Sequence, residues 1–201
     1  MGRNMIYHTN SWPEFTYNAG LAATTMVLIP EREDKKSLAA AFPGFSPEAF
    51  LTIPELIHGY ILNQGGDGLL SRHRVEVILG SILTKSHSRY LKMEQYRPSY
   101  VRALADFIMD FRKTSLEDLE TAMAKLKPDH LSLKEKDLIK IYGEYEKLLP
   151  QYGYDVRSGL FNFLDRTDEG NIRRHLGIAE DQSILVYGFQ SITPPEAKFI
   201  H

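Results

Sequence analysis

The chain has 201 residues, 43% of them hydrophobic, and a formal net charge of −2. This composition is sufficient for a hydrophobic core and is unlike that of a disordered protein. Cysteine is absent, which excludes a disulfide scaffold and a zinc site built on thiolates. No apolar run approaches the roughly 20 residues of a membrane span, and the first residues lack the apolar stretch of a signal peptide. These features predict a cytoplasmic protein that does not contact a membrane.

The first strong signal along the chain is a buried strand. Residues 25–29 form a continuous apolar, β-branched run that ends at Pro30. Such runs are typical of strands buried on both faces of a parallel sheet. The other elements expected in this part are a short β-like run at 5–8, a helix over 31–42, a short strand over 49–52, a helix over 53–62 and a turn at 65–68.

From Ser71 the pattern contains helices alone. The expected starts are Ser71, Pro98, Ser115, Ser132 and Asp155, and the helices that begin at Ser71, Ser115 and Asp155 are expected to end at Leu83, Leu126 and Leu164. Ser132 and Glu135 form a capping box, and Ser115 with Asp118 resembles one. Tyr142 and Tyr145 are expected in the core of this helical block.

A second buried-type apolar run, residues 183–189, returns the chain to the sheet. Thr193, Pro194 and Glu196 then give a strong helix start, with a threonine cap, proline at the first helical position and glutamate three residues after the cap. Only five residues follow Glu196. We therefore expect the native chain to continue beyond His201.

These signals predict an α/β fold, a parallel sheet with a large all-helical inserted subdomain. The expected divisions are a first part of the α/β domain at 5–70, the helical insertion at 71–168 and a return to the α/β domain at 169–201.

The charges are unevenly spread. Residues 72–113 contain nine Lys or Arg against four Asp or Glu, whereas residues 114–169 contain eight against twelve. Tyrosines interleave with the cations of the basic stretch. Cations with interleaved aromatic rings are typical of a surface that binds a nucleic-acid backbone. A solvated helical face has the same pattern, so both interpretations stay open.

Few residues point to chemistry. Glu31, Glu33 and Asp34 follow a strand, where parallel-sheet proteins place their sites, but acidic residues also favour the first turn of a helix. The seven histidines are scattered without the spacing of a metal site. We predict no catalytic, cofactor-binding or metal-ligating residue in this chain.

A nucleotide site is also not expected. A phosphate-binding loop would follow the first β-like run, but residues 8–16 contain neither glycine nor lysine. Tyr187 stands where an ATP hydrolase of this layout has the acid that binds magnesium. Two independent requirements for ATP hydrolysis are therefore unmet.

Five segments, taken in order, resemble the motifs of a known family. They are VLIPE at 27–31, LTIPEL at 51–56, LLSRHR at 69–74, IKIYGEY at 139–145 with Tyr154 and Asp155, and ILVYGF at 184–189 with Thr193 and Pro194. In this order they resemble the AddB/RexB-type subunits of bacterial helicase–nucleases, which are UvrD-like proteins with a PD-(D/E)XK nuclease domain. The chain departs from that pattern at the nucleotide loop and at Tyr187, where the family has aspartate.

The resemblance implies a P-loop-helicase-like sheet (a helicase 1A-like domain) with a 1B-like helical insertion and a degenerate P-loop. It further implies an ATP-incompetent, DNA-binding or scaffold domain of a helicase–exonuclease subunit that acts in double-strand-break repair and recombination. The implied partners are DNA, as a single strand or a duplex end, and a helicase or nuclease subunit. ATP and Mg²⁺ are expected only in that partner or in other domains, and the nuclease beyond His201.

Six residues are predicted to contact DNA phosphates. Thr52 follows from the resemblance, since the family's threonine borders the path of single-stranded DNA, and the cations follow from the basic stretch. The six are Thr52, Arg72, Arg74, Arg89, Lys92 and Arg97. Two alternatives remain: a decayed P-loop-like domain kept as a protein-interaction scaffold without DNA binding, and a small-molecule enzyme that uses Glu31 and Glu33.

Overall fold

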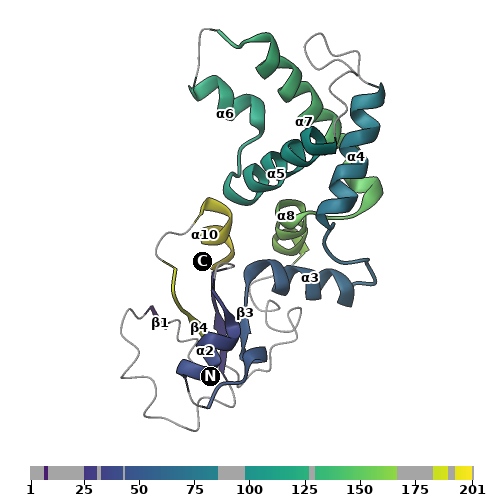
Figure 1. The fold of residues 1–201 in the computed structure, drawn as a ribbon. Coiled ribbons are helices and arrows are strands. Elements are labelled where there is room, and N and C mark those ends of the chain that lie inside the picture. The colour runs from purple at the N-terminus through teal and green to yellow at the C-terminus, as the bar shows by residue number, and fades with distance from the viewer. Residues whose placement is uncertain are drawn as a thin grey trace. The chain divides into compact units, whose positions relative to one another are not determined.

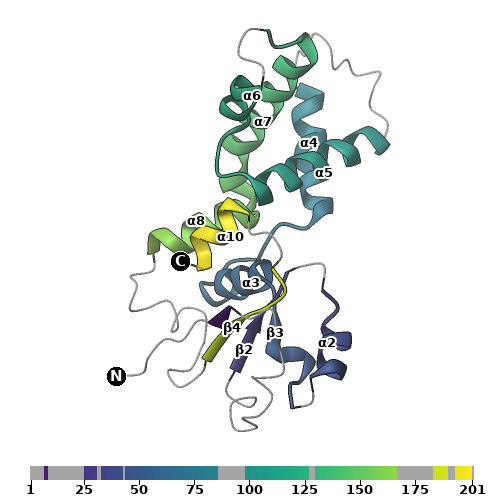
Figure 2. The ribbon, with the colours of Figure 1, turned by 90° about the vertical axis from the view of Figure 1, so that its left-hand side faces the viewer.

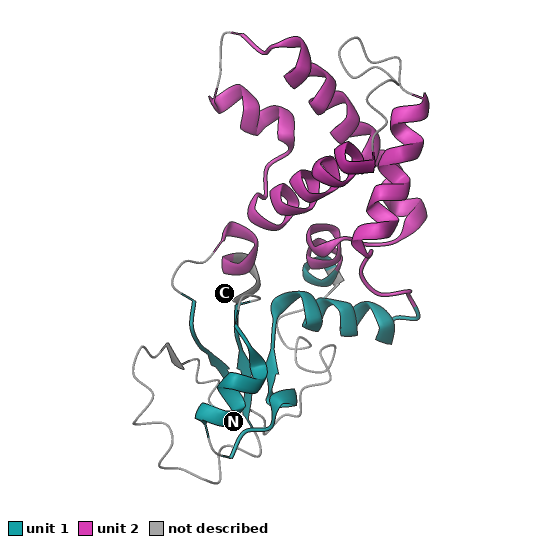
Figure 3. Ribbon diagram, viewed as in Figure 1, with its two compact units in different colours: residues 1–65, 163–192 teal, residues 66–162, 193–201 magenta. Residues whose placement is uncertain are grey.

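The computed structural model describes residues 7–8, 25–30, 33–42, 44–85, 98–126, 130–166, 183–189 and 193–200. The chain divides into two compact units (Figure 1, Figure 3). Unit 1 comprises residues 1–65 and 163–192, and unit 2 comprises residues 66–162 and 193–201. The first passage between the units thus falls at Gly65, and the second falls within a helix, after Asn162.

Unit 1 is built on a small parallel sheet with the strand order β1-β4-β2-β3. The strands are β1 (Tyr7–His8), β2 (Thr25–Leu28), β3 (Phe50–Leu51) and β4 (Ser183–Val186). In β2, Val27 lies opposite Leu185 of β4 and opposite Phe50 of β3. Figure 2 shows β4, β2 and β3 side by side. All of β2 is buried, as its continuous apolar run predicted.

One helix of unit 1 supplies apolar side chains to the sheet. Helix α2 (Lys35–Ala41) follows β2, and a 3₁₀ turn, η1 (Pro47–Ala49), leads into β3. The buried residues of this core are Val27, Ile29, Leu38, Phe42, Phe50 and Leu185.

Helix α3 (Ile53–Asn63) follows β3 and buries one apolar face. Its buried side chains are Ile53, Leu56, Ile57, Tyr60 and Ile61. The ring of Tyr60 meets Phe163 edge-on, with ring centroids 5.0 Å apart. The sequence predicted a helix over 53–62, and the helical spacing of its apolar residues accounts for the buried face.

Helix α2 begins later than predicted. Its start was expected at residue 31, but Asp34 is the N-cap and accepts hydrogen bonds from the backbone N–H groups of Lys36 and Ser37, both at 3.2 Å. The hydroxyl of Ser37 and these amides hold the pKa of Asp34 below its ordinary value. The acidic residue serves here as a cap, which satisfies amides that the first turn leaves unpaired.

Unit 2 consists of helices. They are α4 (Arg72–Lys85), α5 (Pro98–Thr114), α6 (Leu119–Leu126), α7 (Leu133–Tyr152), most of α8 (Val156–Arg166) and α10 (Pro194–Ile200). Helix α4 packs against α5 and α7, and their facing side chains form one core. Its fully buried members include Val75, Leu79, Ala105, Ile108 and Tyr145.

A glycine ends α7 and allows the chain to turn back toward the start of α4. Gly153 ends α7 with a φ of 125°, a left-handed conformation that side chains with a Cβ rarely adopt. The turn brings Tyr154 beside the segment that precedes α4, where the N–H of Leu70 donates to the carbonyl of Tyr154 at 2.7 Å. A Cβ at Gly153 would lie 3.6 Å from Leu70 Cδ2. The two ends of the α4–α7 segment are joined in this way.

Helix α6 also begins later than predicted. Its first residue was expected to be Leu116 with Ser115 as the cap, but it begins at Leu119. Asp118 accepts a hydrogen bond from the N–H of Thr121 at 2.7 Å, whereas the Ser115 hydroxyl accepts one from Glu117 N–H in a local turn. Ser115 and Asp118 are both suitable caps, and the carboxylate of Asp118 is the one that accepts from the first turn of α6.

Each of the described helices is too short or too polar to cross a membrane.

Helix α7 begins at the predicted capping box, which gives a test of stability. The Ser132 hydroxyl accepts from Glu135 N–H at 3.3 Å, and the Glu135 carboxylate accepts from Ser132 N–H at 2.7 Å. We expect Ser132→Ala to lower the free energy of unfolding by about 1 kcal/mol, measured by urea denaturation. Lys134→Ala, an exposed change beside the cap, is the control and should have little effect.

Candidate functional site

The described residues contain one buried arginine, on the apolar face of α5. Arg112 follows the buried residues Leu104, Ala105 and Ile108 at helical spacing and is only 5% exposed. Burial of a charged group is costly unless it is paired and hydrogen-bonded. Arg112 therefore requires charged or hydrogen-bonding partners inside unit 2.

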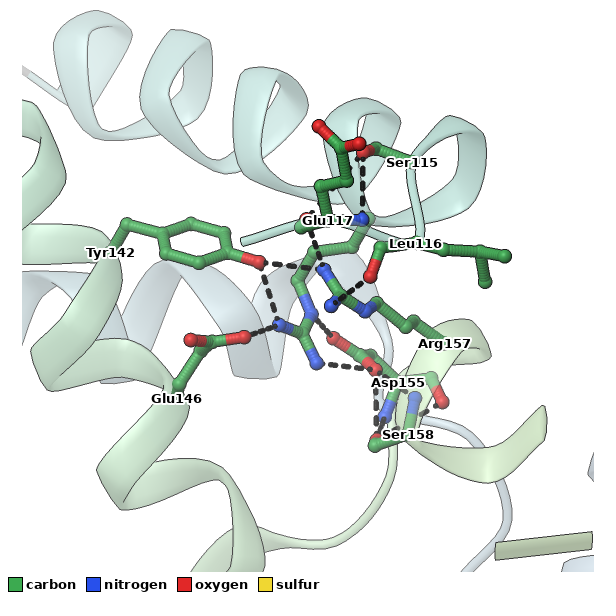
Figure 4. A network of polar contacts seen from close by, with 9 residues as sticks. Ser115, Leu116, Glu117, Tyr142, Glu146, Asp155, Arg157 and Ser158 are labelled. Carbon is green, nitrogen blue, oxygen red and sulfur yellow. Dashed lines mark hydrogen bonds and ion pairs between the residues drawn. The ribbon is translucent and has the colours of Figure 1, made fainter. Parts of the chain in front are cut away.

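The Arg112 guanidinium makes four hydrogen bonds to partners from α7 and from the residue before α8, and Figure 4 labels these partners. Nε donates to Asp155 Oδ2, and Nη2 donates to Asp155 Oδ1 at 3.3 Å. Nη1 donates to Glu146 at 2.6 Å and to the hydroxyl of Tyr142 at 3.0 Å. Burial alone would lower the pKa of Arg112, but Asp155 outweighs it and the pKa is raised above its ordinary value. The guanidinium stays charged, and it ties three helices together.

Asp155 has a second task in the same place. It precedes α8 and accepts a hydrogen bond from Ser158 N–H at 2.8 Å, while its own N–H donates to the Ser158 hydroxyl at 3.0 Å. The sequence predicted this cap. One carboxylate thus begins a helix and neutralises a buried cation.

A second arginine extends the network to the connection between α5 and α6. Arg157 donates to the backbone carbonyls of Leu116 and Glu117 at 2.7 and 2.8 Å. It also donates to the Tyr142 hydroxyl at 3.1 Å. Tyr142 therefore accepts from both arginines, and the α5–α6 connection is held by α8.

Tyr145 differs from its neighbour Tyr142. Its ring is fully buried, and its hydroxyl has no hydrogen-bond partner among the residues that the structure describes. The Arg112 guanidinium carbon lies 5.8 Å from its ring centroid. Burial raises the pKa values of both phenols, that of Tyr145 more strongly.

This cluster balances two guanidinium groups against the carboxylates of Asp155 and Glu146. Every one of these charged groups is engaged in bonds within the cluster. Such an arrangement fixes the positions of helices and orders a connection. It offers no nucleophile beside a free base, so we assign it a structural role.

The predicted phosphate contact Thr52 lies in unit 1 and serves as the N-cap of α3. Its hydroxyl donates to Glu55 Oε2 at 3.0 Å and accepts from Glu55 N–H at 3.4 Å. Lys35 Nζ lies 2.6 Å from the same glutamate. With 9% of its surface exposed, Thr52 is occupied by these local bonds.

Arg72 and Arg74 lie in unit 2, in the first turn of α4, and both side chains are about half exposed. Arg72 Nη2 lies 2.6 Å from Asp106 of α5, and its Nε lies 3.3 Å from Glu76. Arg74 Nη1 lies 3.5 Å from Asp67. The two arginines share the first turn of α4, but at positions i and i+2 of a helix their side chains project in different directions, and each has its own carboxylate partner.

Several predicted residues lie outside the part of the chain that the structure describes. They are Arg89, Lys92 and Arg97, Glu31, and residues 9–16 of the segment in which the sequence shows no phosphate-binding loop. Their predicted roles stay predictions.

Tyr187 lies at the end of β4, against the sheet core. Its ring meets Phe42 edge-on at 5.7 Å between centroids, and its N–H donates to the carbonyl of Leu28 at 2.9 Å. The next residue, Gly188, has a φ of 79°, and a Cβ there would lie 3.5 Å from Pro30 Cδ and 3.7 Å from Glu33 Oε1. The ends of β2 and β4 approach closely at this point.

Among the described side chains, no group of three or more His, Asp or Glu residues is arranged to hold a metal ion.

Sequence reasoning missed the Arg112 network, although it proposed Asp155 as a cap and Tyr142 and Tyr145 as core residues. A signal was present, because Arg112 lies four residues after Ile108 on an apolar face. A lone arginine at such a position predicts a buried ion pair. Its partner Asp155 is 43 residues away and is not identifiable from spacing.

Comparison with known proteins adds no family to this picture. No protein-family model matches the chain, and no curated protein matches it.

Substitution by phenylalanine should affect stability differently at the two core tyrosines. Tyr142→Phe removes a hydroxyl that accepts from two arginines, and we expect it to lower the free energy of unfolding by about 1.5–3 kcal/mol. Tyr145→Phe removes a hydroxyl without a partner, so stability should be unchanged or slightly higher. Urea denaturation of both variants measures the difference, and equal destabilisation would contradict the assigned network.

The raised phenol pKa values predict a loss of stability in alkali. In the unfolded chain these phenols ionise near their ordinary value of 10.0, whereas the folded state keeps them protonated above that pH. Their contribution to stability is therefore complete below this value and is lost as the pH rises above it. Urea midpoints at about pH 9 and about pH 11 should show a smaller drop for Tyr145→Phe than for the wild type. Tyr152→Phe, which changes a half-exposed ring, is the control.

Proposed function

We propose that this chain is a helicase-like, ATP-incompetent DNA-binding domain of a helicase–exonuclease subunit of the AddB/RexB type. Its substrate is single-stranded DNA or a duplex end, and its partner is a helicase or nuclease subunit in double-strand-break repair and recombination. In this proposal the parallel sheet corresponds to a P-loop-helicase-like 1A domain, and the helices of unit 2 to its 1B insertion.

The observation that carries the proposal is the pairing of β2 with β4. These strands contain the first residues of the VLIPE and ILVYGF segments, which are separated in sequence by helices α4 to α8. They are nevertheless parallel neighbours, with Met26 opposite Ile184 and Leu28 opposite Val186. A sheet whose adjacent strands flank a large helical insertion is what the resemblance requires. The pairing supports the proposal because local sequence signals alone do not demand it.

The end of β4 supports the ATP-incompetent part. An ATPase of this layout needs a carboxylate there to hold magnesium. Tyr187 has a neutral phenol, and its ring packs against Phe42. The residue that replaces the acid is thus part of the apolar packing of unit 1. ATP and Mg²⁺ remain assigned to the partner or to other domains.

The exposed cations support the DNA-binding part. Arg72 and Arg74 project from one turn of α4 and keep about half of their side-chain surface in solvent. Arg112 belongs to the same basic stretch of sequence, but it is buried and its guanidinium donates to Asp155 and Glu146. The charge available for phosphate in this stretch is therefore smaller than the sequence count indicates.

Salt-dependent DNA binding is the test. We expect a labelled oligothymidylate to bind the 201-residue chain with an affinity that falls steeply with salt. The double substitution Arg72→Ala with Arg74→Ala should weaken binding about three- to tenfold and flatten the salt slope by at most about 0.7 for each arginine. Fluorescence anisotropy over a range of salt concentrations measures both quantities.

The matched control removes the same charge from another helix of unit 2. Lys134→Ala with Lys136→Ala changes two exposed lysines in the first turn of α7. This control should change affinity far less than the arginine pair. Equal losses would mean that only overall charge matters, and they would contradict the assignment of Arg72 and Arg74.

The alternative is a scaffold that binds protein and not DNA. Among the described residues, the exposed large apolar side chains of unit 2 favour it, with Leu126 77% and Leu133 57% exposed. Single exposed apolar residues are common on protein surfaces, so this support is weak. A folded chain that binds no DNA even at low salt would leave the scaffold as the better reading.

A further inference from the structure

Each of the two predicted phosphate-binding arginines that the structure describes already has an anionic partner. Asp106 of α5 lies 2.6 Å from Arg72, and Asp67, in the glycine-rich turn before α4, lies 3.5 Å from Arg74. Both carboxylates come from outside α4. Glu76, one turn further along α4, adds a second partner to Arg72 at 3.3 Å.

The arginines lie at the N-terminal end of α4, where carboxylates from outside the helix are needed to offset their charge. The first turn of α4 carries Arg72, His73 and Arg74, and no acidic residue. The positive end of the helix dipole disfavours cations at this end of a helix. Asp67 and Asp106 compensate the local positive charge from neighbouring segments. Without them, Glu76 would still face Arg72, but Arg74 would lose the carboxylate that lies beside it.

The ion pairs are open to exchange. The side chains of Arg72 and Asp106 are 51% and 50% exposed, and that of Asp67 is 80% exposed. Exposed pairs of this kind contribute little to stability. A phosphate presents two oxygens to a guanidinium as a carboxylate does, and it can occupy the same donors. Replacing one acceptor by the other requires only side-chain motion.

We propose that Asp106 and Asp67 are exchangeable counter-ions that lower the affinity of Arg72 and Arg74 for a nucleic-acid phosphate backbone. They keep the two guanidinium groups oriented toward solvent, and a phosphodiester displaces them on binding. The inference rests on the proposed DNA-binding function and assigns regulation to its site. Removing one counter-ion therefore strengthens binding.

The chain offers a closely matched pair of variants. Asp106→Asn removes the charge that faces Arg72. Asp110→Asn removes an equal charge one turn further along α5, from an exposed residue that makes no ion pair to the described residues. A general change in net charge affects both variants, whereas loss of the counter-ion affects only the first.

We expect Asp106→Asn to bind oligothymidylate about two- to fivefold more tightly than the wild type. Its salt slope should steepen by up to about 0.7, since one more cation becomes available to the phosphates. Asp110→Asn should show less than about half of the gain in affinity, because salt screens an unpaired surface charge. Circular dichroism and urea denaturation verify that both variants are folded.

A double-mutant cycle locates the effect. In an Arg72→Ala background, Asp106→Asn should lose its advantage over Asp110→Asn, because the cation that the carboxylate masks is gone. An advantage that persists without Arg72 would overturn the proposal, as would equal gains from the two asparagine variants. Weaker binding by Asp106→Asn would also overturn it, because Asp106 would then orient Arg72 for phosphate.

Failure of the proposed function has a different signature. If neither the wild type nor Asp106→Asn binds the oligonucleotide at low salt while both are folded, the DNA-binding function is wrong, and the masking proposal falls with it. Binding by the wild type with an unaltered Asp106→Asn affinity overturns only the masking.

Discussion

Burial of Arg112 is the constraint on which the helical unit depends. A charged guanidinium that is 5% exposed has to find acceptors for its donors, and those acceptors come from α7 and from the cap of α8. Once Asp155 and Glu146 are in place, the directions of three helices at this point are fixed. Arg157 then extends the same network to the α5–α6 connection. Burial of apolar side chains alone would allow more than one packing, whereas directional bonds select one.

The network and the proposed DNA-binding cations use the same residue type in opposite ways. Arg112 is desolvated and hydrogen-bonded to buried partners, whereas Arg72 and Arg74 keep about half of their side-chain surface in water. Both kinds arise from one basic stretch of sequence. Sequence counts of charge therefore overstate the electrostatic field that such a stretch presents to a ligand.

Much of the fold could be predicted because its signals are local. The capping boxes at Ser132 and Thr193 and the cap at Asp155 lie within a few residues of the helices they begin, and all three are confirmed. The late starts of α2 and α6 show the limit of this reasoning, because neighbouring polar residues compete for one cap. Asp34 and Asp118 are the residues that cap these helices, because a carboxylate accepts strong hydrogen bonds from backbone amides.

The candidate site was less accessible to prediction. Spacing indicated that Arg72 and Arg74 share a turn, but the pairing of Arg72 with Asp106 joins residues 34 positions apart. Thr52 and Glu55 form a capping box at the start of α3, so the hydrogen bonds of Thr52 follow from local sequence. Its predicted contact with DNA came from the family resemblance. The order of the strands depends on tertiary packing, and periodicity contains no information about it.

The pairing of β2 with β4 has a consequence for the assembly of the protein on the ribosome. Strand β2 emerges early and is buried along its whole length in the folded unit, but its partner β4 is made only after helices α4 to α8. The helices can form from contacts close in sequence, so their block is able to organise first. During that interval one edge of β2 has no partner, and such an edge is where an apolar strand is exposed to wrong pairings. Among the described strands, β4 is synthesised last, and it is the one that covers the open edge of β2.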